Sequence, residues 1–292
     1  MKILLTGASG FLGSAIARHL SQLGNDVALL LRPNSQLNRL HGQEAFFDIG
    51  RCATDEDLNA FVRSVSPEVV IHTACYYSRL GETYLQLADA NVRLGLLIIQ
   101  ALLSIKHPIT FINTGTALAP NVSPYALSKH HFSQWGRMIA EQSAGQLRFV
   151  NVLLQHMYGP GDDTSKFVSH VLHACHRNDL ELNLTAGEQK RDFIYIDDVV
   201  SAYSTLIYRR NELEPALDIE VGSGVALRVR ELVDIIHRLT GSRTKLCFGS
   251  LPYRTNEPMH CQADLSRMSL LGWEPSHGIE AGLKQTIEQE FQ

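Results

Sequence analysis

The stretch Lys2–Gly13, KILLTGASGFLG, decides the fold class of this chain. Its first five residues are a short apolar run typical of a buried strand, and the residues from Phe11 onward repeat apolar side chains every three to four positions, as an amphipathic helix does. Three glycines, Gly7, Gly10 and Gly13, occupy the junction. A glycine-rich turn that joins a strand to a helix indicates the first unit of a dinucleotide-binding α/β fold.

Each glycine has a physical reason in such a turn. Gly7 permits the tight turn, Gly10 lets the backbone approach a pyrophosphate, and Gly13 lets the helix pack closely on the strand. The helix then offers free N–H groups and a partial positive charge at its N-terminus. A purely structural turn is the weaker interpretation, because three glycines would destabilise it without gain. The predicted pyrophosphate-binding residues are Gly7, Ser9, Gly10, Phe11, Leu12 and Gly13.

Short apolar runs alternate with helical patterns through the N-terminal half of the chain. The runs typical of buried strands are residues 2–6, 26–31, 44–48, 68–73, 109–114 and 148–154. Strands that alternate with helices form βαβ units and a parallel sheet covered on both faces. We therefore predict an α/β fold with a doubly wound parallel sheet of the Rossmann type.

This regularity ends near residue 163. We predict helices at about 164–177 and 228–240, a strand and helix within 191–210, a strand in 216–224 that returns to the sheet, a short strand at 245–248 and two short final helices. These elements indicate a smaller C-terminal α/β domain that binds the substrate. We expect the dinucleotide domain to span 1–160 plus about 192–222 and the second domain 161–191 plus 223–292, with ligands in the cleft between them.

Composition and charge exclude several classes of function. The net charge of −4 gives no basic field for nucleic acid or an anionic membrane. The N-terminus leads directly into a strand pattern instead of a secretory signal, and no uninterrupted apolar run reaches the ~18 residues of a membrane span. Five scattered cysteines without a C-x-x-C pair indicate reduced thiols, so we expect a cytoplasmic protein.

No metal site is predicted. His170, His173 and His176 repeat at i+3 spacing, which carries the third side chain away from the face of the first. They also lack the carboxylate or thiolate support usual in zinc sites. We interpret the row as a surface or groove feature.

The residues after the second strand indicate the coenzyme. An acid at this position holds the ribose 2′-hydroxyl of NAD, whereas an arginine accommodates the 2′-phosphate of NADP. Here Arg32 and Ser35 follow the strand and no acid is present. A guanidinium grips phosphate oxygens in a bidentate manner, so we predict NADPH, with a solvated arginine as the alternative. Asp48 is a candidate contact for the adenine, and a helix N-cap is an equally good interpretation of it.

The segment SPYALSKHHF, residues 123–132, places Tyr125 and Lys129 four residues apart on one helix face. Such a pair is often incidental. The glycine-rich turn and a threonine-rich strand end, NTGT, about ten residues upstream favour a catalytic phenol with an ammonium partner. Thr114 and Thr116 are the two hydroxyls at that strand end, and Thr114 is the preferred one.

Taken in order, TGASGFLG, ANV, NTGT, Tyr125-x-x-x-Lys129, YGPG and RDFIYIDD resemble the motifs of the extended short-chain dehydrogenase/reductases, over the whole chain. The resemblance implies that Tyr125 donates a proton to a C4 carbonyl oxygen as hydride arrives from NADPH. Lys129 and the oxidised nicotinamide would lower the pKa of the phenol from about 10. Lys129 would also hold the nicotinamide ribose, and a threonine hydroxyl would stabilise the carbonyl oxygen.

Within this family the chain is similar to reductases of the CDP-paratose synthase and CDP-abequose synthase type, on TACYYSR, FINTGTALAPNVSPYALSK and IEVGSGVALRVRELVD. This implies reduction of the C4 ketone of a nucleotide-linked, CDP-type 4-keto-6-deoxy or 3,6-dideoxyhexose for an O-antigen or related deoxysugar. The strand end lacks the Thr-Asp-Glu of family dehydratases. A 4-epimerase with tightly bound NAD and a non-catalytic dinucleotide-sensing regulator are the alternatives. The family's habit of pairing long helices implies a homodimer.

The resemblance also implies the remaining site residues. Further cofactor contacts are Ile49, Thr73, Ala74, Cys75, Asn91 and Gln155. The hexose pocket would be lined by Tyr76, Tyr77, Ser78 and Thr116, with His156 at a position where the family often has Asn, and Lys166 nearby. Arg191 and Arg254 would bind the diphosphate and Glu257 a ribose hydroxyl. Surface ion pairs, loop packing and a core histidine remain the structural alternatives for these residues.

Overall fold

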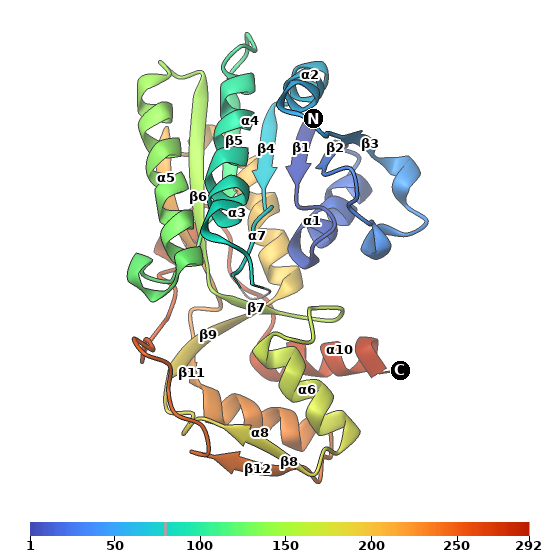
Figure 1. Cartoon of the computed structure of the whole chain (residues 1–292), viewed down its shortest axis with the longest axis vertical. Helices are drawn as coiled ribbons and strands as arrows, with labels where there is room; N and C mark the ends of the chain where they lie inside the picture. Colours follow the sequence, from blue (N-terminus) through green and yellow to red (C-terminus); the bar gives the residue numbers. More distant parts are fainter. Residues whose placement is uncertain (79–80, 292) are drawn as a thin grey trace. The chain divides into compact units, whose positions relative to one another are not determined.

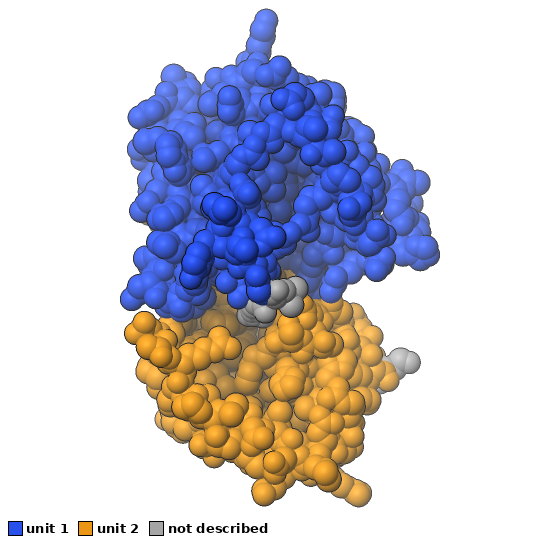
Figure 2. Space-filling model, in the orientation of Figure 1, with its two compact units in different colours: residues 1–153, 203–219 blue, residues 154–202, 220–292 orange. Residues whose placement is uncertain are grey.

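The structure is a computed structural model that describes residues 1–78 and 81–291 (Figure 1). The chain forms two compact units, one of Met1–Leu153 with Tyr203–Ile219 and the other of Leu154–Ala202 with Glu220–Gln292 (Figure 2). These bounds differ from the expected domains at their edges. Residues 192–202 group with the second unit, because the strand Lys190–Tyr195, which contains the first of them, pairs within that unit's own sheet.

A seven-stranded sheet with the order β10-β6-β5-β4-β1-β2-β3 organises the first unit. Its strands are β1 (Lys2–Thr6), β2 (Asp26–Leu31), β3 (Asp48–Arg51), β4 (Val69–His72), β5 (Ile109–Thr114), β6 (Leu147–Leu154) and β10 (Ala216–Val221). β1 pairs in parallel with both β2 and β4, and β5 pairs in parallel with β4 and β6. The chain order reverses on either side of β1, so the predicted doubly wound sheet is confirmed.

Helices cover this sheet as the βαβ pattern requires. They are α1 (Phe11–Gln22), α2 (Asp55–Val65), α3 (Tyr84–Ala88), α4 (Leu94–Leu102), α5 (Pro124–Gln142) and α7 (Ile196–Tyr208), of which the residues from Tyr203 onward belong to the first unit. Side chains of α2, α4 and α5 share one core cluster with Leu4, Val70 and Phe111 of the sheet. Two helix glycines permit close packing there, since a Cβ on Gly95 or Gly136 would lie 2.2 Å from a phenylalanine ring.

A π-helical turn, Asp89–Arg93, joins α3 to α4. Within the described residues one helical segment, Tyr84–Leu102, is long and apolar enough by composition to cross a membrane. We expected no membrane-spanning segment because no uninterrupted apolar run is long enough. The helical segment Tyr84–Leu102 is interrupted by the charged residues Asp89 and Arg93. Ile98, Ile99 and Leu102 of α4 are buried in the core cluster, which accounts for the apolar character of that half.

The prediction of a strand at residues 44–48 is wrong. Glu44–Phe46 form a 3₁₀ turn, and the strand β3 begins only at Asp48. Pairing with β2 sets this register, with Ala28 opposite Asp48 and Leu31 opposite Arg51. The apolar run misled the prediction because Phe46 is 68% exposed instead of contributing to the core.

The second unit has two small sheets. One has the order β11-β9-β7, from β11 (Ala226–Arg228), β9 (Lys190–Tyr195) and β7 (His156–Tyr158), and the other pairs β8 (Glu181–Leu184) with β12 (Lys245–Phe248). Its helices are α6 (Phe167–Arg177), α8 (Val229–Leu239), α9 (Ser266–Leu270) and α10 (Ile279–Phe291). The last helix has 13 residues and is longer than expected. The carboxylate of Asp192, fully buried on β9, accepts backbone N–H groups of Ser223, Gly224 and Ala263.

Candidate active site

The glycine-rich turn after β1 has a shape that only glycine allows. Gly7 has a φ of 78°, in the left-handed region, and its carbonyl accepts the N–H of Gly10 at 2.9 Å. A Cβ on Gly7 would lie 2.4 Å from the Thr73 hydroxyl, and a Cβ on Gly13 would lie 2.2 Å from the Gly7 carbonyl oxygen. Helix α1 then begins at Phe11 with no side chain capping its N-terminus. The turn therefore fits the pyrophosphate of a dinucleotide.

The end of β4 is tied to the end of β1 beside this turn. The Thr73 hydroxyl donates to the Thr6 carbonyl at 2.7 Å, and the Ala74 N–H donates to the Thr6 hydroxyl at 3.3 Å. The Thr6 hydroxyl also lies 2.8 Å from Nδ1 of His72. Strand order reverses between β1 and β4, which is where ligands bind in open α/β sheets. The predicted cofactor residues Thr73, Ala74 and Cys75 thus adjoin the glycine-rich turn.

His72 is a buried histidine that the sequence analysis did not single out. Its side chain is fully buried, and its Nε2 has no hydrogen-bond partner among the described residues. Burial, assisted by the nearby charge of Lys129, lowers the pKa of His72 to about 3. The imidazole is therefore neutral at physiological pH, which suits a site that already contains the Lys129 amine.

Arginines gather at the loop that follows β2. The Nη1 of Arg32 donates to the hydroxyl of Tyr76, and its guanidinium carbon lies 5.2 Å from the centre of the Tyr76 ring. Arg51, on β3, donates to the carbonyls of Pro33 and Ser35 at 3.0 and 2.8 Å. Nothing in the local sequence singles out Arg51, because a residue at the end of the third strand carries no signal that it braces the loop after the second. Asp48 and Ile49 occupy the start of β3, and because Asp48 lies in a strand it is not the helix N-cap of its alternative interpretation.

Tyr125 and Lys129 lie one turn apart near the start of α5. Ser123 caps this helix by accepting the Ala126 N–H at 3.1 Å. Tyr125 is half-buried, and its ring centre lies 5.1 Å from that of Tyr77. Lys129 is only 2% exposed, and its Nζ has no hydrogen-bond partner among the described residues. A buried donor without a partner is costly, so the amine fits a ligand hydroxyl such as that of a ribose.

Burial also changes the acidity of this lysine. It lowers the pKa of the Lys129 ammonium, and an electrostatic interaction with Cys75 acts on that pKa in the opposite direction. The two side chains are therefore electrostatic neighbours, which is consistent with the predicted position of Cys75 beside the cofactor.

Asn91 fixes the chain that follows β4. It lies fully buried in the π-helical turn, accepts the Tyr76 N–H at 2.7 Å, and donates to the Tyr76 carbonyl and the Ser128 hydroxyl at 2.9 Å each. Ser128 in turn donates to the carbonyl of Tyr125 at 2.8 Å. One amide side chain thus connects the segment after β4 to the helix that carries the Tyr125–Lys129 pair.

The two threonines at the end of β5 have different partners. The Thr114 hydroxyl lies 2.6 Å from the hydroxyl of Tyr203 on α7, whereas the Thr116 hydroxyl accepts the Leu118 N–H at 3.2 Å. Tyr203 is fully buried, and burial raises the pKa of its phenol well above the usual value. Nothing in the local sequence singles out Tyr203, because it lies 89 positions downstream of Thr114.

The predicted diphosphate residues lie in the second unit. Arg191 of β9 is 6% exposed, forms an ion pair with Glu257 and donates to the Lys190 carbonyl at 2.7 Å. Arg254 precedes Glu257 in the same turn and is exposed. The structure thus brings Arg191 and Glu257 together, and both of these predicted ligand contacts already have a protein partner.

The remaining predicted residues of this unit are held by their neighbours. Lys166 forms an ion pair with Asp162 at 2.8 Å, and the backbone N–H of Gln155 donates to the Val221 carbonyl. The ring centre of His156 lies 5.9 Å from that of Phe193. In the first unit, Ser78 is exposed and has a positive φ of 59°.

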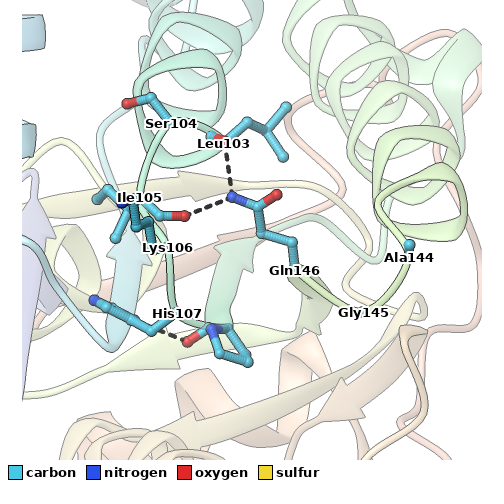
Figure 3. A pocket seen from close by; sticks show the side chains of 9 residues that line it. Leu103, Ser104, Ile105, Lys106, His107, Ala144, Gly145 and Gln146 are labelled. Atoms are coloured by element: carbon cyan, nitrogen blue, oxygen red, sulfur yellow. Dashed lines mark hydrogen bonds between the residues drawn. The ribbon is translucent and has the colours of Figure 1, made fainter.

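The chain also has a histidine row on α6 and a pocket beside β5 and β6. Among residues 1–78 and 81–291, no three histidine, cysteine or acidic side chains converge on a point that could hold a metal. His173 instead lies 3.3 Å from Glu290, and His176 stacks on Phe291. A pocket of about 470 Å³ lies between Leu103–Pro108 and Ala144–Gln146 (Figure 3). It is at the amino ends of β5 and β6, away from the glycine-rich turn, and Gln146 donates to two carbonyls in it.

The fold and this site define a class of protein. The chain belongs to the NAD dependent epimerase/dehydratase family, whose model matches residues 3–222. It is 27% identical over 299 residues to the CDP-abequose synthase of Salmonella typhimurium, across 98% of this chain and 97% of that one. It is 28% identical to the GDP-L-fucose synthase of Escherichia coli, across 98% and 95%.

A solved structure supports the fold. The UDP-glucose 4-epimerase of Thermotoga maritima, in a structure with UDP-glucose, superposes with a TM-score of 0.86 at 22% identity, over 99% of this chain and 98% of that one. At this identity the likeness establishes the Rossmann-type architecture.

Proposed function

We propose that this protein is an NADPH-dependent reductase of the C4 ketone of a nucleotide-linked hexose. The substrate would be a CDP-type 4-keto-6-deoxy or 3,6-dideoxyhexose, in the biosynthesis of O-antigen or related deoxysugars. The observation that carries the proposal is the buried Lys129 amine, without a hydrogen-bond partner in the described residues, one turn beyond Tyr125. The 27% identity to a CDP-abequose synthase across nearly both chains supports the substrate class.

The residues of the first unit suit proton delivery. A bound NADPH would supply the hydride. Tyr125 gives its phenolic proton to the carbonyl oxygen, so the phenol O–H bond breaks and an alcohol O–H bond forms. Lys129 favours the resulting phenolate by its positive charge.

A hydroxyl at the end of β5 would hold the same oxygen. Because burial keeps the Tyr203 phenol protonated, Tyr203 can donate to Thr114 across their 2.6 Å contact. The Thr114 hydroxyl then retains its own proton for the carbonyl oxygen, where it stabilises developing negative charge. Thr116 is the second candidate, and its hydroxyl also retains a proton when it accepts the Leu118 N–H.

The charges at the adenosine end support NADPH as the coenzyme. Arg32 follows β2 where NAD-binding chains carry an acid, and Arg51 braces the same loop. Gly7, Ser9, Gly10, Phe11, Leu12 and Gly13 would hold the pyrophosphate. In the second unit, Arg191, Arg254 and Glu257 are proposed to bind the substrate diphosphate and ribose.

A 4-epimerase that retains NAD is the second candidate. Its support is the solved-structure likeness to UDP-glucose 4-epimerases and a 27% identity to a putative UDP-glucose 4-epimerase of Methanocaldococcus jannaschii. The third option, a non-catalytic regulator, has less support because Tyr125 and Lys129 are both present. A dehydratase is disfavoured because Thr114-Gly115-Thr116 contains no carboxylate.

One experiment separates these candidates. The purified protein is assayed for retained NAD, and then for stoichiometric NADPH oxidation against a panel of nucleotide-linked 4-ketosugars, with NMR of the product. A reductase consumes one NADPH per sugar reduced. Retained NAD with interconversion of sugar epimers and no net NADPH oxidation would establish the epimerase instead.

We also propose a cytoplasmic homodimer. Helix α5 exposes Leu127, Trp135 and Met138 on one side, and exposed apolar side chains in a row mark contact surfaces. Light scattering after size exclusion should give twice the chain mass, and Trp135→Glu should give the monomer, with Gln134→Glu as the matched control. A wild-type monomer would refute the dimer.

A further inference from the structure

Arg32 and Tyr76 meet across the strand that carries the glycine-rich turn. Arg32 follows β2 and Tyr76 follows β4, and β1 lies between these two strands. The Arg32 guanidinium donates to the Tyr76 hydroxyl and lies 5.2 Å from its ring centre, within the range of a cation–π contact. The family resemblance implied a place for Tyr76 in the hexose pocket, and the proposed reaction gives its contact with Arg32 no role.

Tyr76 is a well-anchored acceptor. Its backbone N–H and carbonyl are both bonded to the side chain of Asn91, at 2.7 and 2.9 Å. Asn91 is fully buried and also donates to Ser128. The backbone of Tyr76 therefore cannot move without breaking two hydrogen bonds to the buried Asn91.

The loop that carries Arg32 is anchored as well. Arg51 donates to the carbonyls of Pro33 and Ser35, and the Ser35 N–H donates to the carbonyl of Arg32 at 3.1 Å. The backbone is thereby fixed, while the long side chain of Arg32 keeps several rotatable bonds. An exposed arginine side chain loses much rotamer freedom when it binds a ligand, unless a neighbour already orients it.

We propose that Tyr76 is a positioning residue for coenzyme choice. Its hydroxyl and ring hold the Arg32 guanidinium ready for the ribose 2′-phosphate, and so contribute to the preference for NADPH over NADH. The contact engages Nη1, and a guanidinium has five N–H donors, which leaves others for phosphate oxygens. This inference rests on the NADPH assignment of the proposed function.

The test uses two ligands that differ by the 2′-phosphate. Binding of 2′,5′-ADP and of 5′-AMP is measured by calorimetry for the wild type, Tyr76→Phe and Arg32→Ala. Tyr76→Phe keeps the ring and removes only the hydroxyl, so we expect about fivefold weaker binding of 2′,5′-ADP, as for one net hydrogen bond, and unchanged binding of 5′-AMP. Tyr84→Phe, which removes the hydroxyl of an 80% exposed tyrosine, is the matched control.

The results distinguish a failure of the Tyr76 positioning role from a failure of the NADPH assignment on which it rests. If Arg32→Ala weakens 2′,5′-ADP but Tyr76→Phe binds it as well as or better than the wild type, the positioning role is refuted and the NADPH assignment stands. If Arg32→Ala leaves 2′,5′-ADP binding unchanged, the NADPH assignment fails and the inference with it. Equal weakening of 5′-AMP by Tyr76→Phe would show a general structural effect and also refute the role.

Discussion

Two buried cationic side chains, Lys129 in the first unit and Arg191 in the second, differ in their protein partners. Lys129 has no hydrogen-bond partner among the described residues, whereas Arg191 is paired with Glu257 and bonded to the Lys190 carbonyl. The difference follows from their acidities. Burial lowers the pKa of the Lys129 ammonium, whereas a guanidinium keeps its charge throughout the physiological pH range and needs a counter-ion when buried.

This contrast suggests two routes to binding. The lysine would gain its first hydrogen bonds when a coenzyme ribose arrives. The arginine would exchange one carboxylate for a diphosphate, with Glu257 released toward the substrate. Breaking either arrangement should therefore have different consequences for activity and for stability.

Replacing the lysine should have the largest effect on turnover. We expect Lys129→Met to lower kcat/KM by roughly 10³-fold, the scale of lost acid–base assistance, while the free energy of unfolding changes little because no internal hydrogen bond is lost. Steady-state kinetics and urea unfolding measure the two effects. Lys106→Met, at an exposed lysine, is the control. A large loss of stability in Lys129→Met would show that the folded protein depends on the Lys129 amine, contrary to its lack of a hydrogen-bond partner among the described residues.

Removing the counter-ion of Arg191 should chiefly affect stability. Glu257→Ala leaves a guanidinium buried and unpaired, so we expect a loss of about 3 kcal/mol in the free energy of unfolding. The double change Arg191→Met with Glu257→Leu should recover most of it. Denaturant unfolding measures both, with Glu288→Gln as an exposed control. A single variant as stable as the wild type would mean that the pair does not neutralise Arg191.

His72 should make the first unit sensitive to acid. Its pKa is about 3 in the folded state and 6.5 as the ordinary value, so the unfolded chain binds the extra proton between these pH values. The imidazole's contribution to stability should fall by up to about 1.4 kcal/mol per pH unit as the pH drops below 6.5. Unfolding free energies of the wild type and His72→Gln at pH 7, 6 and 5 should converge. Parallel curves would refute a neutral buried His72.

Tyr203 should have the smallest effect. Tyr203→Phe removes the hydroxyl that orients Thr114, so we expect kcat to fall by about fivefold, the scale of one net hydrogen bond, with KM for NADPH unchanged. Thr114→Val should cause a larger loss than Tyr203→Phe. If Thr116→Val abolishes turnover while Thr114→Val is active, the hydroxyl assignment moves to Thr116.

Local sequence patterns were informative where the structure depends on neighbours in the chain. The glycine spacing after β1 and the Tyr125–Lys129 spacing on α5 both act within one or two turns of backbone, so the predicted turn and helix face were visible in short segments. The strand at 44–48 was misplaced because an edge strand's register depends on its pairing with β2. Hydrophobicity alone cannot report that pairing.

By itself, the sequence determined the α/β class, the doubly wound sheet and the placement of Tyr125 and Lys129 one turn apart on a helix, because periodicity and short spacing encode them. Only the tertiary structure decided which groups meet across the fold: Tyr203 with Thr114, Arg51 with the loop after β2, Tyr76 with Arg32, and Glu257 with Arg191. The physical reason is that these contacts join residues 16 to 89 positions apart. Strand order and pairing, which place such residues side by side, are properties of the whole sheet.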